Sequence, residues 1–207
     1  LMRAIKTLPI YRIRDGYESI KKNDQTFDAT KEILAKGGVV AIFPEGSHHI
    51  NRTVRQLSKG FTRIVFETLE TYPESDLQLI PVGINFIKSE DFGDSTAVFF
   101  GKPIAAKDYI IEDRNEAVVA LKRDVQKAIS ELTTHIPAEN YSETLERLEQ
   151  HHPDYLNPQE TNKCISSNFG ECTTHSKPRK NVLKPIAKYL LVLNFLFRAQ
   201  YEDEFDY

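Results

Sequence analysis

The chain has 207 residues, of which 40% are hydrophobic and 28% are charged, and its formal net charge is -3. This composition is typical of a globular protein and excludes a disordered one. The small net charge creates no overall field, so we expect no nucleic-acid partner and anion binding only at a local site.

Strands and helices alternate along the first 135 residues. Apolar and β-branched runs predict strands at 8–14, 39–43, 77–86 (interrupted by Pro81) and 97–100. Apolar residues at helical spacing predict helices at 24–36, 58–72 and 115–132. Asp24 and Ser58 are plausible caps for the first two helices, and Gly37-Gly38 ends the first. This alternation predicts an α/β domain over 1–135, with a mainly parallel sheet flanked by helices.

The composition changes after residue 135. Residues 136–181 are polar and predict a linker or helical extension, with a helix at 142–150. Residues 182–207 form an apolar segment with lysines and an acidic end, which is too short and too charged to span a bilayer. This segment could lie as an amphipathic helix in a membrane interface or dock as a core helix, and the sequence leaves both open.

The two cysteines, Cys164 and Cys172, lie in the polar stretch. No histidine or cysteine stands at a zinc-binding spacing from them, and their pairing would close only a short loop. We therefore predict that both are reduced intracellular thiols.

The strand predicted at 39–43 ends in the turn Pro44-Glu45-Gly46. In open α/β sheets, ligands bind at the carboxyl edge of the strands, where this turn would lie. The rigid proline and the permissive glycine would hold Glu45 in place between them. Taken alone, such a carboxylate could equally be structural, so the turn gains meaning only from the motifs around it.

Three further short blocks accompany this turn in order. The sequence Phe-Pro-Glu-Gly-Ser at 43–47 follows Pro-Ile-Tyr-Arg at 9–12 and precedes Ser-Lys-Gly at 58–60 and Ile-Pro-Val at 80–82. The set resembles the blocks of the glycerophosphate and lysophosphatidate acyltransferase family, over roughly residues 5–133. It is most similar to the bacterial lysophosphatidate-type members. The resemblance implies a glycerolipid acyltransferase-like fold.

The family also carries a first block, His-x-x-x-x-Asp, which is not present. None of the six histidines is followed by aspartate five positions later. The resemblance implies that this histidine is the general base for the acceptor hydroxyl, which attacks an acyl thioester, and that the aspartate orients it. We therefore expect an N-terminally truncated chain, inactive or weakly active alone, whose full-length parent is the acyltransferase.

The remaining blocks imply a site for the acceptor phosphate. Arg12 matches the family's phosphate-binding arginine and Arg14 is a second candidate, because a guanidinium fork suits a phosphate monoester. The alternative is two solvated arginines on an edge strand. The acceptor-binding turn is matched by Glu45, Gly46, Ser47 and His48, where the family usually has arginine in place of His48. Arg52, Arg55 or Lys59 could replace that contact, Lys59 from a helix N-terminus that favours anions.

The remaining candidates are apolar or weak. Pro44, Ile80, Pro81 and Val82 would shape the site and the acyl path, and Pro81 and Val82 could equally be core residues. Glu45 with His48-His49 is a poor metal pair without a third ligand, so we predict no metal. The resemblance implies no cofactor beyond the thioester co-substrate, acyl-CoA or acyl carrier protein.

The resemblance therefore implies an O-acyltransferase that transfers a fatty acyl group to lysophosphatidate in phospholipid biosynthesis. The expected partners are the lysophospholipid acceptor, the thioester donor and a membrane surface, at the cytoplasmic face of a bacterial inner membrane. Two alternatives stay open. One is a non-catalytic lipid- or membrane-binding module that kept the fold without the base, and the other is a generic phosphate-binding α/β protein.

Overall fold

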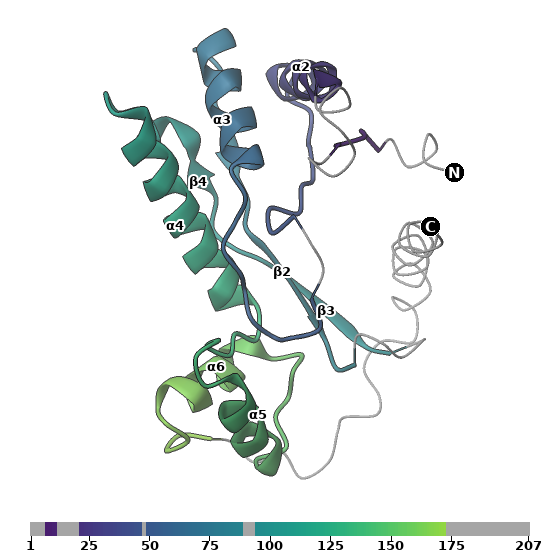
Figure 1. Cartoon of the computed structure of the whole chain (residues 1–207), viewed down its shortest axis with the longest axis vertical. Coiled ribbons are helices and arrows are strands. Elements are labelled where there is room, and N and C mark those ends of the chain that lie inside the picture. The colour runs from purple at the N-terminus through teal and green to yellow at the C-terminus, as the bar shows by residue number, and fades with distance from the viewer. Residues whose placement is uncertain (1–6, 12–20, 47–48, 89–93, 173–207) are drawn as a thin grey trace. The chain divides into compact units, whose positions relative to one another are not determined.

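The computed structural model describes residues 7–11, 21–46, 49–88 and 94–172 (Figure 1). Helices and short strands make up these residues, which confirms a mixed α and β protein. The chain divides into two compact units that interleave in the sequence. The first contains Leu1–Ser47, Gln56–Leu79 and Pro103–Val125, and the second contains His48–Arg55, Ile80–Lys102 and Gln126–Tyr207. The predicted domain end at 135 stays a prediction.

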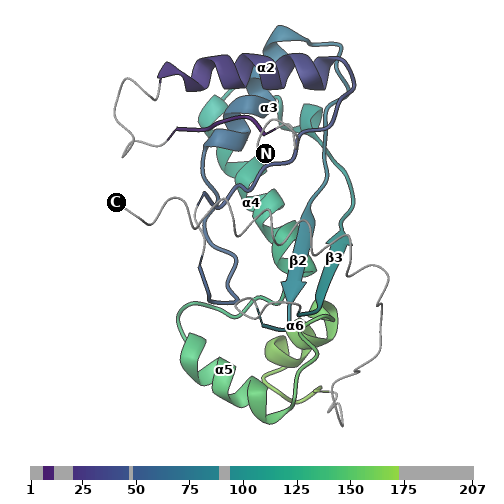
Figure 2. The ribbon, with the colours of Figure 1, turned by 90° about the vertical axis from the view of Figure 1, so that its right-hand side faces the viewer.

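Two helices pack together in the first unit (Figure 2). α2 spans Asn23–Ala35 and α3 spans Gly60–Thr71, as their apolar spacing predicts. Gly37, with φ of 74°, ends α2: its N–H donates to Leu34 O, and the Gly38 N–H donates to Ile33 O. This pair of bonds is the Schellman motif, which requires a left-handed residue that glycine supplies at least cost.

The starts of these helices differ from the prediction. Asp24 lies inside the first turn of α2, where its carboxylate pairs with Arg63 of α3 at 2.9 Å. Lys59 stands at the N-cap of α3, one residue after Ser58, and makes no side-chain cap bond. The prediction that Asp24 and Ser58 cap these helices is therefore wrong.

The core of the first unit surrounds α3. Its buried apolar side chains are Phe27, Leu57, Phe61, Ile64, Val65, Phe66, Leu69, Leu77, Ala106, Ala117, Leu121 and Val125. β1 (Gln78–Leu79) pairs antiparallel with β4 (Ile104–Ala105), which leads into the 3-10 helix η2 (Ala106–Tyr109). α4 (Arg114–Leu132) follows, and its last turns belong to the second unit.

Residues 39–43 do not form the buried strand that was predicted. They carry no strand assignment, and Val39, Ile42 and Phe43 are 93%, 45% and 60% exposed. A strand is buried on both faces only when neighbouring strands and helices cover it. Within the described residues no strand pairs with this run, so most of its apolar side chains stay exposed.

The second unit contains a two-stranded antiparallel sheet, in which β2 (Val82–Phe86) pairs with β3 (Thr96–Phe100). Both described strand pairs are antiparallel, so the expected mainly parallel sheet is not found in this part of the chain. The reason lies in the connection: residues 87–95 are too few for the crossover that parallel neighbours need. One sheet face, with Gly83 and Asn85, packs on Leu132 at the end of α4.

Two short helices complete the second unit and lie side by side in Figure 1. α5 spans Tyr141–Gln150, as predicted, whereas α6 (Pro158–Ser166) falls in the stretch predicted as linker. Asn157 caps α6 by accepting from the Glu160 N–H, and Pro158 occupies its first turn. An asparagine cap followed by proline is a common signal for the start of a helix, so the sequence does contain the information that predicts α6.

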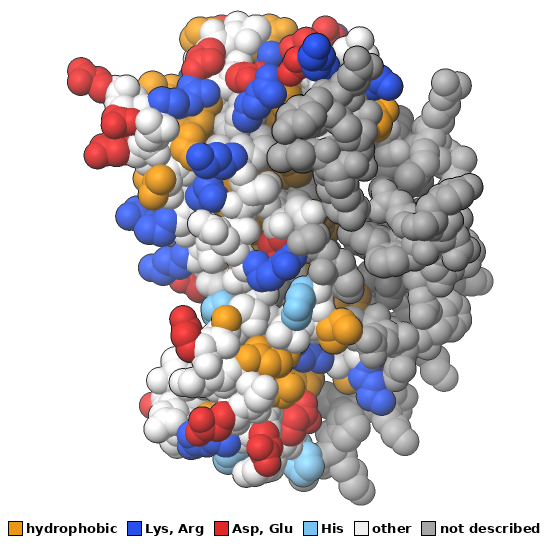
Figure 3. Space-filling view, viewed as in Figure 1, with side chains coloured by type: hydrophobic (Ala, Val, Ile, Leu, Met, Phe, Trp, Pro, Cys, Tyr) orange, Lys and Arg blue, Asp and Glu red, His pale blue; other side chains and the backbone are white. Residues whose placement is uncertain are grey.

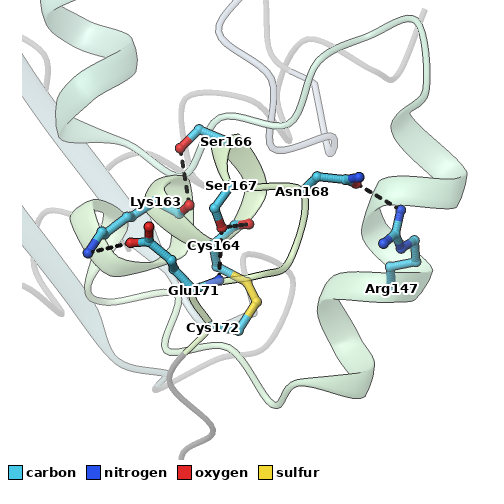
Figure 4. Close-up of a disulfide and its surroundings, with 8 residues drawn as sticks. All are labelled: Arg147, Lys163, Cys164, Ser166, Ser167, Asn168, Glu171 and Cys172. Atoms are coloured by element: carbon cyan, nitrogen blue, oxygen red, sulfur yellow. Dashed lines mark hydrogen bonds and ion pairs between the residues drawn. A yellow bond between two sulfur atoms is a disulfide. The ribbon is translucent and has the colours of Figure 1, made fainter.

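A disulfide joins Cys164 to Cys172, so the prediction of reduced thiols is wrong for this structure (Figure 4). After α6 the backbone turns back through Asn168 and Phe169, both with positive φ, which brings the two Cα atoms within 4.5 Å. An ion pair between Lys163 and Glu171 at 2.7 Å spans the same turn. The segment 182–207, predicted as amphipathic, lies outside the described residues, within which no helix is long and apolar enough to cross a membrane.

Candidate functional site

The motif at 43–46 forms a tight turn in the first unit. The Gly46 N–H donates to the Phe43 carbonyl at 3.3 Å, which closes a β-turn around Pro44 and Glu45. Proline suits the second position of such a turn because its ring fixes φ. Gly46 has φ of 70°, a conformation that glycine adopts without a Cβ penalty. The turn holds Glu45 half-buried.

A second hydrogen bond joins this turn to the start of α3. The Ser58 N–H donates to the Pro44 carbonyl at 2.7 Å, and a Cβ built on Gly46 would lie 3.9 Å from the Ser58 Cβ. Ser58 and Lys59 are exposed, and no side chain at the N-cap covers the first turn of the helix. Because helix N-termini and ammonium groups both attract negative charge, this corner favours an anion.

The Pro9-Ile10-Tyr11 block is fixed to α2 in the same unit. Asn23, 7% exposed, donates from Nδ2 to the Tyr11 carbonyl at 2.8 Å and accepts from the Tyr11 N–H at 2.8 Å. The Thr26 hydroxyl donates to the Pro9 carbonyl at 2.8 Å. Asn23 was not among the predicted site residues, because the sequence does not distinguish a polar residue at the start of a helix from a cap. The anchored block leads directly to Arg12.

Four predicted site residues lie outside the described residues: Arg12, Arg14, Ser47 and His48. Their roles in acceptor binding stay predictions. Beside them, His49 accepts at Nδ1 from the Asn51 N–H at 2.9 Å. Among the residues that the structure does describe, no group of three His, Cys, Asp or Glu side chains is placed to hold a metal.

Arg52 and Arg55 lie in the second unit, where Arg52 makes several protein contacts. Its guanidinium donates to the Phe86 carbonyl at 2.7 Å and to the Ile87 carbonyl, and lies 3.6 Å from the centre of the Tyr155 ring. Burial, followed by the hydrogen bond to Glu149, raises the pKa of Tyr155 above its ordinary value. The ring under Arg52 is therefore a neutral phenol at physiological pH.

The Ile80-Pro81-Val82 block leads into β2. Pro81 is buried, and its carbonyl accepts from the Gly101 N–H at 2.8 Å, which ties the block to the end of β3. Ile80 and Val82 are 55% and 36% exposed. Pro81 is thus part of the packed interior of the second unit, while the two flanking side chains face outward.

The basic side chains are spread over several elements of the face seen in Figure 3, and acidic side chains lie among them. Within the first unit some of the basic groups are neutralised by ion pairs, such as that between Lys31 and Glu67 at 3.4 Å. The net charge of -3 creates no large overall field of one sign. An anion would be held by local groups.

Comparisons with known proteins agree with the motif. A family described as Acyltransferase matches residues 1–85, the part that contains Glu45, Lys59 and the 9–12 block. An uncharacterized acyltransferase of Schizosaccharomyces pombe is 28% identical over 129 residues, which cover 59% of this chain and 19% of that protein. Glycerol-3-phosphate O-acyltransferase 1 of Saccharomyces cerevisiae is 26% identical over 125 residues, covering 56% of this chain and 16% of its own length. No solved structure matches.

Residues 1–85 match the Acyltransferase family, and together with the two relatives this match supports a relation to the glycerophospholipid acyltransferases. The two relatives are fungal, whereas the sequence motifs were most similar to bacterial members. The chain spans less than a fifth of the length of either relative, 19% and 16%. The similarity therefore concerns only the part of each relative that this chain matches.

Proposed function

We propose that this chain is the acceptor-binding part of an O-acyltransferase of glycerolipid synthesis, acting on lysophosphatidate. The observation that carries the proposal is the Glu45 turn held against the start of α3 by the Ser58 to Pro44 hydrogen bond, at 2.7 Å. A phosphate monoester near Lys59 would meet an ammonium and the helix N-terminus. Arg12, which follows the anchored Tyr11, would supply the guanidinium.

Glu45 has a different task in this proposal. A carboxylate accepts hydrogen bonds, so Glu45 would bind a hydroxyl of the glycerol moiety rather than the phosphate. Holding the acceptor at both its phosphate and its hydroxyl fixes its orientation toward the acyl thioester, either acyl-CoA or acyl carrier protein. The sequence of 207 residues contains no His-x-x-x-x-Asp pair, and we assign none of its residues to proton transfer.

Glycerol 3-phosphate is a second candidate acceptor. The name of the Saccharomyces cerevisiae relative favours it, because that protein is a glycerol-3-phosphate O-acyltransferase. Both acceptors carry a phosphate monoester on glycerol, and they differ in the acyl chain. Lysophosphatidate is itself a membrane lipid, so the first candidate implies work at a membrane surface, which we propose to be the cytoplasmic face.

Binding by the 207-residue chain tests the proposal. Isothermal titration with glycerol 3-phosphate, with short-chain lysophosphatidate below its micelle concentration, and with monoacylglycerol compares the two acceptors and a phosphate-free analogue. We expect Lys59→Ala and Glu45→Gln each to weaken binding of the phosphate-bearing ligands, by about tenfold for the lysine. Lys36→Ala, an exposed lysine paired with Glu32 on α2, is the control and should bind normally. Equal affinity for monoacylglycerol would reject the phosphate assignment.

A further inference from the structure

Arg52 lies in the loop 49–55, which continues the chain from the acceptor motif toward α3. Its side chain is engaged on two sides within the second unit. The guanidinium donates to the carbonyls of Phe86, at 2.7 Å, and Ile87, at the end of β2, while its plane covers the Tyr155 ring at 3.6 Å. An arginine held both by its donors and by its face has little freedom to turn toward a ligand.

The backbone of this loop is held at the same place. The Arg52 N–H donates to the Tyr141 hydroxyl at 3.1 Å, and the Arg52 carbonyl accepts from the Ile136 N–H at 2.7 Å. The Thr53 hydroxyl donates to the Ile136 carbonyl at 2.7 Å, and the Val54 N–H donates to Nδ1 of His135 at 3.0 Å. Residues 135–141 therefore hold three successive residues of the loop.

The partner of Arg52 is itself rigidly placed. Tyr155 is 7% exposed, and its hydroxyl hydrogen-bonds Glu149 of α5. It belongs to one apolar cluster with Ile136, Leu148 and Cys164. The helical segment 136–172, part of the stretch predicted as a linker or helical extension, thus supplies a packed base for the loop.

We infer that Arg52 is a positioning residue, which fixes the loop 49–55, between the Glu45 turn and α3 in the sequence, on the helical segment 136–172. This inference rests on the proposed acceptor site. It replaces the sequence-based candidacy of Arg52 as a direct phosphate contact. The two roles require different properties of the side chain. A phosphate contact requires its positive charge, whereas the positioning role requires the planar guanidinium and the Tyr155 ring beneath it.

Four variants of the 207-residue chain separate these roles. Arg52→Lys keeps the charge but cannot hold two carbonyls and cover a ring, and Arg52→Ala removes the side chain. Tyr155→Leu removes the ring and leaves Arg52 in place. Tyr155→Phe is the matched control, because it loses only the hydroxyl bond to Glu149 and keeps the stacked ring.

Hydrogen exchange of the amides of Arg52, Val54 and Ile136 is the first readout, and glycerol 3-phosphate affinity is the second. We expect Arg52→Lys, Arg52→Ala and Tyr155→Leu each to speed exchange at these amides by about tenfold or more, and to weaken binding by a similar factor. Tyr155→Phe should leave both unchanged. Thermal unfolding of each variant excludes general loss of the fold.

Two results would overturn the inference. Unchanged exchange in Arg52→Ala would show that the side chain does not hold the loop. Wild-type affinity in Arg52→Lys, with loss only in Arg52→Ala, would show that the charge acts directly on the phosphate. If the unmodified chain fails to bind glycerol 3-phosphate or lysophosphatidate, the proposed function fails, while hydrogen exchange still decides whether Arg52 fixes the loop.

Discussion

The side-chain amide of Asn23 pairs with both backbone groups of Tyr11, with two hydrogen bonds of 2.8 Å. The Asn23 amide thereby satisfies the two backbone groups of Tyr11 that a neighbouring strand would otherwise pair with. Asn23→Ala should leave the Tyr11 N–H and carbonyl without these partners, and lower the free energy of unfolding by about 1–3 kcal/mol. Urea unfolding measures this loss. Acceptor affinity should fall as well, if the block positions Arg12.

Thr26 provides the companion test for the same block. Thr26→Val removes the hydroxyl that donates to the Pro9 carbonyl and keeps the shape of the side chain. Thr26→Ser keeps the hydroxyl, so it should preserve the acceptor affinity that Thr26→Val loses. Equal affinity in all of these variants, Asn23→Ala included, would show that the anchoring of residues 9–11 has no part in acceptor binding.

Local signals in the sequence were enough to predict α2, α3, α4 and α5, although not α6. The left-handed glycine Gly37 ends α2 where the chain must change direction, and the apolar spacing of α3 and α4 matches the buried Ile64, Leu121 and Val125. Such features depend on a few neighbouring residues. The strand pairs depend on connections: the nine residues 87–95 between β2 and β3 already favour an antiparallel pair over the predicted parallel sheet.

The features that sequence reasoning missed depend on distant partners. Arg52 is 34 residues from Phe86 and its side chain also covers Tyr155, so no local pattern separates a positioning arginine from a phosphate-binding one. The pairing of Cys164 with Cys172 depends on the reversal of the backbone at Asn168 and Phe169, two residues without the usual glycine signal. The motif at 43–46 was predictable because proline and glycine determine the turn themselves.

Gly83 tests the packing of β2 on α4. A Cβ at this position would lie 2.2 Å from the backbone carbonyl oxygen of Leu132, and a backbone atom cannot move aside as a side-chain tip does. Gly83→Ala should therefore destabilise the chain by about 1–3 kcal/mol in urea unfolding. Gly60→Ala is the control, because its nearest neighbour is the Ser58 Oγ at 3.8 Å. Equal stability of the two variants would contradict the close packing of Gly83.

The disulfide makes a prediction that depends on the redox state. Closing so short a loop restricts the unfolded chain, so Cys172→Ser or reduction by dithiothreitol should lower stability by about 2–3 kcal/mol. Thiol titration of the denatured, unreduced protein should find no free thiol at these two positions. Two free thiols, with stability indifferent to dithiothreitol, would restore the reduced state that the sequence first indicated.

Tyr109 predicts how stability changes at alkaline pH. Burial, followed by its hydrogen bond to Asp124 at 2.9 Å, raises the pKa of Tyr109 to about 12. An unfolded tyrosine titrates near pH ~10, so between these values the folded chain holds a proton that the unfolded chain has lost. By linkage this contribution is complete below pH ~10 and is lost as the pH rises toward the folded pKa. Urea unfolding across this range should show a fall in stability that is smaller in Tyr109→Phe, while absorbance at the phenolate band follows the ionisation itself.

Asp124→Asn should lower the pKa of Tyr109 only in part, since burial is the larger cause. A phenol that ionises near pH ~10 in the folded chain would contradict the combined effect of partial burial and the Asp124 hydrogen bond.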